Sequence, residues 1–399
     1  MLSPRYLFDR LRDLHFSDFA AVLPMLMALC VRPFSGHRYA NTWLICEEPA
    51  EARDNGYHFF RFLRQSHPEQ KAIYAIADNS VDRDKVSQLG PTVRYGSVRH
   101  WIIYFSCHFN ISSSKGGKPN AALCAFLELN GLFRPRNIFL QHGVIINDLR
   151  WLYADRSCID LFVTSTVSET HYVRQHFGYD PSVVRMTGLC RFDNLHDAPP
   201  LRRRIVVMPT WRYWFNLQSK KHSDTDADVA HSEYLHRWRE FLDAPQLAQL
   251  LDKHGVELVF FPHRNMQPHL HSFTGINPNV VIASWRDFDI QELLKSASML
   301  VTDYSSVFFD MVYMRRPVAF YQFDEDLYRK YQYGKGYFDY HDNPFGRSHS
   351  QLQPLIDDIQ SWIEADFRVP QSFLDAHTRE FPLYDTLNSK RLYDELAAL

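Results

Sequence analysis

The chain has 399 residues, which is more than one hydrophobic core usually organises, so two domains are expected. Its 44 lysines and arginines nearly balance its 46 aspartates and glutamates, and this excludes an overall basic field that would recruit nucleic acid. The six cysteines lie far apart without paired spacing, so neither a disulfide framework nor a zinc site is expected, and a reducing cytoplasm is the natural compartment.

The N-terminal region is unusually apolar for the start of a chain. It lacks the order of basic, apolar and small residues that marks a secretion signal. Its longest apolar run, Phe19 to Val31, contains Pro24 and is expected to be too short to span a bilayer. Because arginines flank this run, residues 16–32 fit a helix at a membrane interface, and they fit a helix packed in a core equally well.

In the first half of the chain, short apolar runs alternate with helix-like segments such as GYHFFRFLRQSH and SETHYVRQHF. The alternation predicts a parallel, doubly wound α/β sheet. The expected strands are Thr42–Glu48, Ala72–Asp78, His108–Ser114, Asn137–Gly143 and Asp160–Thr166.

A linker is expected at LHDAPPLRRR, residues 195–204, because paired prolines followed by arginines cannot continue a helix. The predicted domains are therefore 1–197 and 204–399, with the last helix packing back on the first domain. The polar segment 217–231 is expected to be a mobile loop. The strand pattern restarts after the linker, in Arg204–Thr210, Val256–His263, Asn279–Ser284, Ala297–Asp303 and Arg316–Gln322.

The strand at Asn137–Gly143 ends unusually, because the apolar pair Phe139-Leu140 is followed at once by Gln141-His142-Gly143. Ligands of parallel α/β sheets bind at the carboxyl ends of the strands, and His142 lies at such an end. A lone histidine there is more often satisfied by a neighbouring carbonyl group. The polar residues that follow the strands of the second half favour a functional role for His142 over a structural one.

Polar clusters also follow strands of the second half, in MPTWR, FFPHRN and VTDYSSVFFD. Cationic side chains together with a helix that starts at Ser305-Ser306 suit a pyrophosphate group. The sequence contains neither GxxxxGK[ST] nor GxGxxG, so a P-loop and the usual dinucleotide turn are excluded. A nucleotide diphosphate donor held by the second domain is the hypothesis that remains.

These stretches resemble the CDP-glycerol glycerophosphotransferases, the teichoic acid and capsule polymerase family. FLQHGVIIND, GLCRFD, MPTWR, FFPHRN, TDYSSVFFDMVYMRRPVAFYQFD and YGKGYFDYHDNPFG occur in the family's order. The resemblance implies a GT-B fold, in which two Rossmann-like domains face each other across a cleft. It also implies peripheral action at the cytoplasmic side of the bacterial membrane, and transfer of glycerol phosphate from CDP-glycerol to a hydroxyl of a lipid-linked or glycan acceptor.

By that resemblance His142 is the candidate base, and His263 is a second catalytic candidate. An imidazole with a pKa near neutrality suits a base that must accept a proton from the acceptor hydroxyl. Many family members have His-Pro where this chain has His263-Arg264, so Arg264 either adds a phosphate contact or marks a different polyol. The residues expected to bind the donor are Gly143, Arg191, Thr210, Trp211, Arg212, Arg264, Thr302, Asp303, Ser305, Ser306 and Asp310.

The first sheet shows no DxD-like pair after a strand, so no metal is required, and magnesium held loosely by the donor pyrophosphate stays open. Two other classes of function remain as alternatives: a GT-B glycosyltransferase or epimerase that uses a UDP-sugar, and a nucleotide-binding module without turnover. Within the leading class, the donor is CDP-glycerol or CDP-ribitol, and the acceptor stays open.

Overall fold

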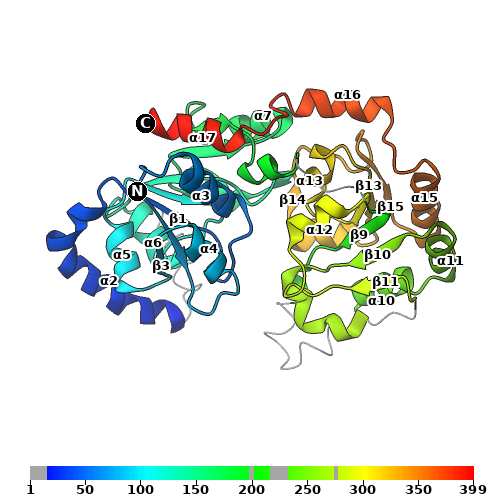
Figure 1. Ribbon diagram of the computed structural model, residues 1–399, viewed down its shortest axis with the longest axis horizontal. Coiled ribbons are helices and arrows are strands. Elements are labelled where there is room, and N and C mark those ends of the chain that lie inside the picture. Colours follow the sequence, from blue (N-terminus) through cyan, green and yellow to red (C-terminus); the bar gives the residue numbers. More distant parts are fainter. Residues whose placement is uncertain (1–15, 197–201, 216–231, 274–276) are drawn as a thin grey trace. The chain divides into compact units, whose positions relative to one another are not determined.

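The computed structural model describes residues 16–196, 202–215, 232–273 and 277–399. Two compact units make up the chain (Figure 1). The first unit comprises Met1–His142, Arg150–Asp193 and Asp385–Leu399, and the second comprises Gly143–Leu149 and Asn194–Tyr384. Half of the expected linker, residues 197–201, and all of the expected loop at 217–231 lie outside the described residues.

The first unit is built on a seven-stranded parallel sheet with the order β3-β2-β1-β4-β5-β7-β8. Each strand predicted in the first half is confirmed. The strands are β1 (Trp43–Cys46), β2 (Ala72–Ile76), β3 (Thr92–Arg94), β4 (Phe109–Ser112), β5 (Arg136–Phe139), β7 (Leu161–Thr164) and β8 (Val184–Met186).

The second unit is built on a six-stranded parallel sheet with the order β11-β10-β9-β12-β13-β15. The strands predicted in the second half are confirmed as well. They are β9 (Arg204–Met208), β10 (Glu257–Phe260), β11 (Val280–Ile282), β12 (Met299–Thr302) and β13 (Val318–Tyr321), and β15 (Gly346–His349) adds an edge. A short antiparallel pair joins β6 (Asn147–Asp148) to β14 (Gly334–Lys335).

The sequence pattern missed β3, β8 and β15, and each of these strands lies at an edge of its sheet. Edge strands are short and half exposed, so they lack the continuous apolar run of a strand covered on both faces. The exposed Arg94 in β3 and the exposed Arg347 in β15 illustrate this. The missed strands extend both sheets without altering the order of the predicted ones.

Helices connect the parallel strands, as right-handed crossovers require. In the first unit they are α2 (Phe16–Ser35), α3 (Asn55–Ser66), α4 (Arg83–Leu89), α5 (Val98–Tyr104), α6 (Ala121–Leu129), α7 (Val167–His176) and α17 (Asn388–Ala397). In the second unit they are α10 (Glu233–Leu242), α11 (Pro245–His254), α12 (Ile290–Ser296), α13 (Phe308–Tyr313), α14 (Glu325–Tyr331), α15 (Leu352–Glu364) and α16 (Gln371–Glu380). Short 3₁₀ segments occur at η1 (Gly36–Tyr39), η2 (Arg150–Leu152), η3 (Cys190–Asn194) and η4 (Arg264–Phe273).

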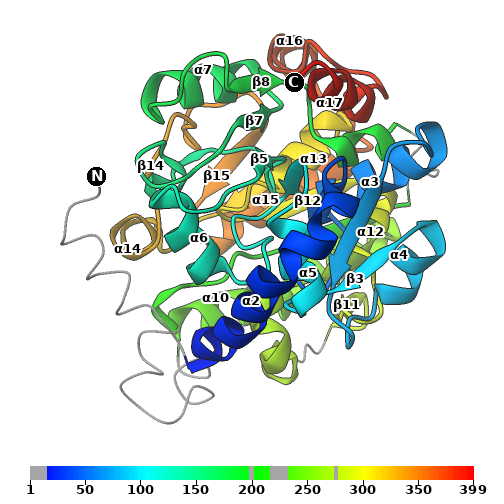
Figure 2. The same cartoon turned by 90° about the vertical axis from the view of Figure 1, so that its left-hand side faces the viewer.

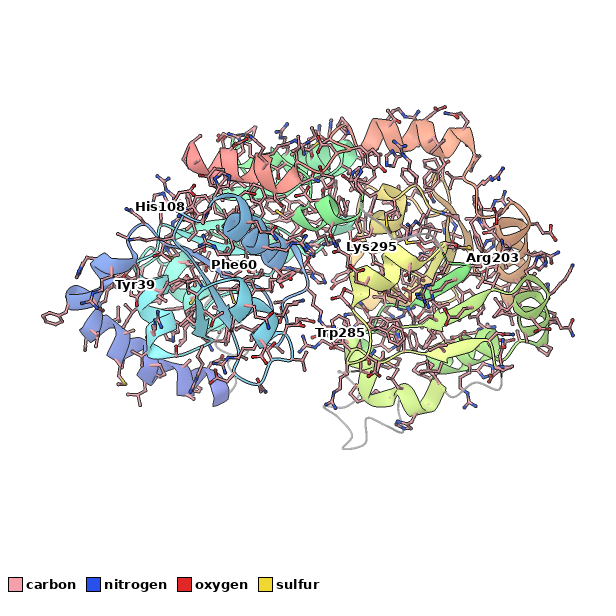
Figure 3. All side chains as sticks on the ribbon, in the orientation of Figure 1. Tyr39, Phe60, His108, Arg203, Trp285 and Lys295 are labelled. Atoms are coloured by element: carbon pink, nitrogen blue, oxygen red, sulfur yellow. The ribbon has the colours of Figure 1, made fainter. Side chains whose placement is uncertain are left out.

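Each sheet packs its apolar strands against its own helices. In the first unit Phe60 of α3, labelled in Figure 3, is fully buried and lies 5.4 Å from Tyr74 of β2 between ring centroids. In the second unit Trp238 of α10 is fully buried and lies edge-on to Tyr321 of β13. Each unit therefore has its own hydrophobic core, which is the usual definition of a domain.

The apolar N-terminal run forms a continuous helix, α2, that passes through Pro24. The segment Asp18–Tyr39 has 22 residues and a mean hydropathy of 1.6, so by length and composition it is long and apolar enough to cross a membrane. The expectation that this run is too short was wrong, because the helix extends well beyond the apolar stretch read from the sequence. Figure 2 shows α2 lying along α5, and Ala28 of α2 is fully buried in the core there.

In both sheets the strand order reverses next to the first strand of the unit. In the first unit the reversal lies between β1 and β4, and in the second between β9 and β12. In folds of this topology ligands bind at the carboxyl edge of the sheet, beside such a reversal.

Candidate active site

His142 lies just beyond the carboxyl end of β5, which ends at Phe139. Gln141 before it has a φ of 65°, an uncommon conformation for a residue with a side chain. Its buried amide group holds that kink by donating to the carbonyl oxygen of Val163 and to Glu169 Oε1. The side chain of Asn55 donates to the Gln141 carbonyl oxygen at 2.8 Å. The strand therefore stops abruptly, and His142 turns out of the sheet with its side chain 84% exposed.

The imidazole of His142 contacts the carboxylate of Asp54. Nδ1 lies 2.6 Å from Asp54 Oδ2, and the Asp54 side chain is only 14% exposed. Asp54 occupies the N-cap position of α3 but does not cap the helix with its side chain. An aspartate at this position usually accepts a backbone N–H of the first helical turn. The Asp54 carboxylate instead contacts the imidazole of His142.

Arg191 of η3 joins the same cluster. One terminal nitrogen of its guanidinium lies 2.9 Å from Asp54 Oδ1 and donates to the His142 carbonyl oxygen at 2.7 Å. Its backbone N–H donates to Asn55 Oδ1 at 3.0 Å. Arg191 was expected to bind the donor, and in the structure its side chain, 10% exposed, instead contacts the candidate base and its carboxylate partner.

Glu47 follows β1 and holds the loop that carries Asp54. Its Oε2 accepts the backbone N–H groups of Arg53 at 3.1 Å and Asp54 at 3.3 Å, and its Oε1 accepts that of Tyr57 at 2.7 Å. A Cβ at position 56 would lie 2.9 Å from Glu47 Cγ, so a larger residue there would displace the Glu47 side chain. The β1–α3 loop is thus fixed around one buried carboxyl group.

The charges of this cluster shift its protonation equilibria. The Asp54 carboxylate raises the pKa of His142 from 6.5 to about 9. Burial alone would raise the pKa of Asp54, but His142 and Arg191 hold it below its ordinary value. Burial, with the charge of Asp54, raises the pKa of Glu47 to about 8. The contact with Asp54 therefore favours the imidazolium form of His142 and moves its pKa above the near-neutral value expected from the sequence.

The polar clusters of the second half follow β10, β9 and β12, which are neighbours in the second sheet. They therefore meet at one carboxyl edge, as the sequence predicts. The backbone joins them as well, because the N–H of His263 donates to the Pro209 carbonyl at 3.3 Å and that of Thr210 donates to Asp303 Oδ1 at 2.8 Å.

Arg212 does not present its guanidinium at this edge, and its predicted role as a phosphate ligand is corrected. The side chain is fully buried. Nε and Nη2 bind Asp324 at 2.8 and 3.0 Å, and Nη1 binds Asp303 at 2.7 Å and the Thr210 carbonyl at 2.7 Å. Because its donors are used inside the unit, Arg212 instead fixes the β9 and β12 ends relative to each other.

Three further predicted donor ligands are also buried. Thr302 donates its hydroxyl to the Met208 carbonyl at 2.7 Å, and Asp303 accepts from the N–H groups of Thr210 and Tyr304. Asp310 is only 2% exposed, so it is neither a surface acid nor presented to a polyol at the surface. Because their side chains are buried, the predictions that Thr302, Asp303 and Asp310 contact the donor are corrected, as is that for Arg212.

The other predicted residues of this edge are accessible. His263 and Arg264 are exposed, and Thr210, Trp211, Ser305 and Ser306 are half buried. Ser305 Oγ accepts the N–H of Val307 at 3.3 Å, and α13 begins at Phe308, two residues later than expected. Their part in donor binding stays a prediction.

Gly143 begins a segment of the second unit, Gly143–Leu149, although His142 before it belongs to the first. Within the second unit this segment pairs with the YGKG motif through β6 and β14, and Arg329 donates to Asn147 Oδ1 at 2.8 Å. Gly336 must be glycine, since a Cβ there would lie 2.3 Å from the Ile146 carbonyl oxygen. This motif therefore has a structural role that the sequence did not reveal.

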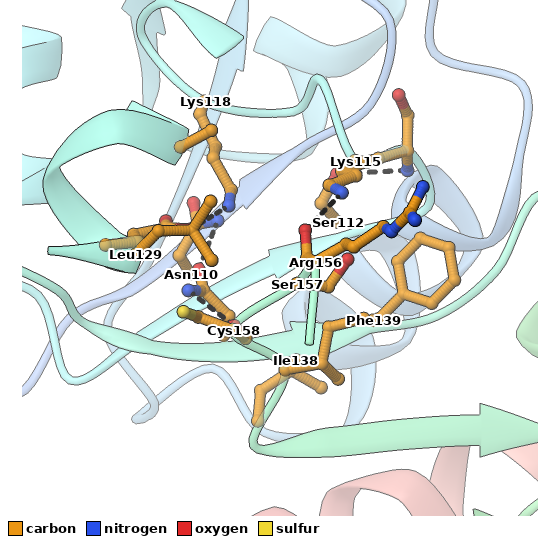
Figure 4. A pocket seen from close by; sticks show the side chains of 15 residues that line it. Asn110, Ser112, Lys115, Lys118, Leu129, Ile138, Phe139, Arg156, Ser157 and Cys158 are labelled. Atoms are coloured by element: carbon orange, nitrogen blue, oxygen red, sulfur yellow. Dashed lines mark hydrogen bonds and ion pairs between the residues drawn. The ribbon is translucent and has the colours of Figure 1, made fainter. Parts of the chain in front are cut away.

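A pocket in the first unit lies between the sheet, α6 and residues 156–159 (Figure 4). Its charged groups are held within the unit, because Lys118 pairs with Glu128 at 2.6 Å and Lys115 donates to the carbonyl oxygens of Trp151 and Arg156. The pocket lining, taken over the described residues, contains none of the predicted site residues. Among all the residues that the structure describes, no cluster of three or more His, Cys, Asp or Glu side chains is placed to hold a metal ion.

Sequence reasoning missed Asp54, Asn55 and Glu47. A signal was present in CEEPAEARDN, where acids follow the first strand and an Asp-Asn pair precedes the next helix. These acids follow the carboxyl end of β1, and the strand order reverses between β1 and β4. Site residues of such folds gather at that point of the sheet.

Comparison with known proteins gives a family match over nearly the whole chain. The family described as CDP-Glycerol:Poly(glycerophosphate) glycerophosphotransferase matches residues 27–398. The minor teichoic acid biosynthesis protein GgaB of Bacillus subtilis (strain 168) is 27% identical over 393 residues, which cover 95% of this chain and 42% of that protein. The teichoic acid poly(ribitol-phosphate) polymerase of Bacillus spizizenii is 35% identical over 217 residues, 50% of this chain and 32% of that protein. The chain spans less than half the length of these curated relatives.

Solved structures agree on the fold. The wall teichoic acid polymerase TagF matches with a TM-score of 0.65 at 16% identity, covering 100% of this chain and 98% of that one. A putative UDP-N-acetylglucosamine 2-epimerase from Listeria monocytogenes matches with a TM-score of 0.56 at 11% identity, covering 90% and 96%. These likenesses confirm the predicted α/β fold of the GT-B type, with two Rossmann-like units.

Proposed function

Because the chain belongs to the CDP-glycerol:poly(glycerophosphate) glycerophosphotransferase family, we propose that it transfers glycerol phosphate from CDP-glycerol to an acceptor hydroxyl. The acceptor is a lipid-linked or glycan intermediate of teichoic acid synthesis, and CMP is released. The observation that carries this proposal is the pair formed by His142 and Asp54 at the carboxyl edge of the first sheet. It supplies the proton acceptor that such a transfer needs.

In the proposed reaction the acceptor oxygen attacks the phosphorus that bears glycerol. A new phosphorus–oxygen bond forms as the bond to the bridging oxygen of the pyrophosphate breaks, and CMP leaves with that oxygen and its electron pair. The hydroxyl proton passes to Nε2 of neutral His142. Charge that builds on the phosphoryl oxygens must be stabilised, and exposed His263 and Arg264 with the hydroxyls of Ser305 and Ser306 are the groups suited to that task.

CDP-ribitol is the second candidate donor. It is supported by the likeness to a poly(ribitol-phosphate) polymerase, and to a teichoic acid ribitol-phosphate primase of Bacillus spizizenii that is 24% identical over 209 residues. The description of the family itself favours glycerol. Both donors carry the same cytidine diphosphate, so the residues proposed to contact the pyrophosphate would serve either donor.

We propose that the protein acts peripherally at the cytoplasmic side of the membrane. The support is the exposed apolar face of α2, where the side chains of Phe19, Leu23 and Phe34 are 64%, 66% and 80% exposed. The opposite face of the helix packs on the core, so α2 would lie in the interface with that face towards the protein. This location would bring the enzyme to an acceptor anchored in lipid.

No metal ion is required in this proposal, although magnesium bound to the donor pyrophosphate is compatible with it. The predicted consequence is that EDTA leaves the rate of CMP release within about twofold of its original value. A large loss restored by magnesium would contradict this part of the proposal.

Donor choice is tested by incubating the protein with CDP-glycerol, CDP-ribitol or a UDP-sugar in the presence of a lipid-linked acceptor. Release of CMP from one of the CDP-polyols is the expected result, with no UDP released. UDP release from the sugar nucleotide with both CDP-polyols left intact would replace the proposal by a glycosyltransferase.

A further inference from the structure

We propose that Asp54 is a positioning residue for His142, and that Glu47 and Arg191 fix Asp54 in that role. The Asp54 carboxylate binds Nδ1 of the imidazole, so that Nε2 is the nitrogen that accepts the proton of the acceptor hydroxyl. This inference rests on the proposed function, because it assigns the orientation of the base used there. It adds Asp54 and Glu47, which the sequence motifs do not identify, and it gives Arg191 a role other than the predicted contact with the donor.

The tautomer follows from the contact. An ionised carboxylate only accepts hydrogen bonds, so at 2.6 Å the Nδ1 atom of His142 must carry a hydrogen. In a neutral imidazole only one nitrogen carries a hydrogen, which leaves the lone pair on Nε2. Because the His142 side chain is 84% exposed while Asp54 is 14% exposed, the ring is held at one edge and open to solvent elsewhere.

Asp54 is held at three points, and this distinguishes it from an exposed surface acid. Its backbone N–H donates to Glu47 Oε2 at 3.3 Å, its Oδ1 binds Arg191 at 2.9 Å, and its Oδ2 binds His142. Arg191 also binds the His142 carbonyl oxygen, so one guanidinium fixes both partners. Fixing the carboxylate before substrate binds lowers the entropy that must be lost to orient the base.

The charged groups that act on His142 are few. Asp54 is in direct contact, Glu51 also raises the pKa of His142, and Arg191 lowers it. Of these, Asp54 has the largest effect. Replacing Asp54 by asparagine keeps the side-chain shape but removes the charge, so both the orientation and the titration of His142 should change together.

The matched control is Asp82, which holds the same loop without contacting His142. Asp82 Oδ2 accepts the N–H of Ala52 at 3.0 Å and pairs with Arg53 at 2.8 Å. A variant Asp82→Asn therefore removes a charge that holds the same loop while leaving Asp54 and His142 in contact. Loss of function that arises only from loop instability should appear in both variants.

The experiment measures the histidine titration by NMR and the rate of CMP release for the full chain and for Asp54→Asn, Asp82→Asn and Glu47→Gln. For Asp54→Asn we expect the His142 pKa to fall towards 6.5, and kcat to fall about 10²- to 10⁴-fold with CDP affinity within about threefold. Glu47→Gln should lose about 10- to 100-fold in kcat, because one amide group cannot accept the N–H groups on both sides of the carboxyl. Asp82→Asn should keep the His142 pKa and most of the rate.

An Asp54→Asn variant in which His142 titrates as before overturns the inference, whether or not the protein turns over CDP-glycerol. Equal losses of rate in Asp54→Asn and Asp82→Asn overturn it as well. If the unaltered protein releases no CMP from either CDP-polyol, the proposed function fails. A fall of the His142 pKa in Asp54→Asn would then still support the contact, so the two failures are distinguishable.

Discussion

The Nδ1 atom of His142 lies 2.6 Å from Oδ2 of Asp54, although the two residues are 88 positions apart in the chain. The contact joins the end of β5 to the loop after β1, two strands separated by β4 in the first sheet. Because a carboxylate at this distance stabilises the charged imidazole, the pair sets both the orientation and the protonation of the candidate base.

The pair predicts how activity depends on pH. A base must be neutral to accept a proton, and Asp54 raises the pKa of His142 from 6.5 to about 9. We expect kcat/KM for CMP release to rise with pH and to level off between these two values, since solvent around the exposed ring weakens the interaction. A profile of kcat/KM from pH 5 to 10 measures this, and a rate that is flat or falls over that range would contradict His142 as the base.

The same raised pKa has a consequence for folding. The favourable contact of His142⁺ with Asp54 is fully present below pH 6.5, the ordinary value, and is lost as the pH rises through about 9. The free energy of unfolding of the first unit should therefore decline over this interval, and the decline should be smaller in Asp54→Asn. Denaturant unfolding at a series of pH values measures it, and equal declines in both proteins would argue against the contact.

His142 and His263 should have separable roles. His142→Ala is expected to lose about 10²- to 10⁴-fold in kcat with a modest change in CDP affinity. His263→Ala is expected to weaken CDP binding by roughly 1.5 to 3 kcal/mol, because it removes a charge-assisted contact. Titration calorimetry with CDP beside initial rates measures both. If His142→Ala fails only by losing CDP, His142 is a donor ligand and not the base.

Arg212→Ala should destabilise the second unit. The substitution leaves Asp303 and Asp324 buried without their counter-charge, and the loss of one partner from such a group costs about 3 to 5 kcal/mol. Arg203→Ala is the control, because its pair with Asp366 is exposed on both sides and is worth about 0 to 1 kcal/mol. Thermal unfolding measures both variants, and equal shifts in Tm would contradict the structural role given to Arg212.

Membrane association should depend on the exposed face of α2. Leu23→Asp with Phe34→Asp places charge at side chains that are 66% and 80% exposed, and should release the protein from membranes while preserving the fold. Leu29 packs on the core, so Leu29→Asp would test stability instead. Co-sedimentation with anionic lipid vesicles measures binding. If the double variant folds and binds vesicles as before, the face is not the membrane contact.

The fold was largely predictable because buried parallel strands leave continuous apolar runs, such as those of β1 and β12. The sequence predicted which residues lie at the strand ends, but it did not predict which of them would contact a ligand and which would be buried. Arg212 looks like a phosphate ligand in MPTWR, yet its partner Asp324 is 112 residues away and no local pattern reveals that pairing. Asp54 was missed for the same reason, since only the folded sheet brings the loop after β1 to His142.

The most direct measurement of the central claim is mass spectrometry of the acceptor after incubation with CDP-glycerol, beside the amount of CMP formed. The account predicts an acceptor heavier by glycerol phosphate, one CMP for each unit added, and loss of both products in His142→Ala. CMP formed without any gain in acceptor mass, or an acceptor that gains mass equally well in His142→Ala, would contradict it.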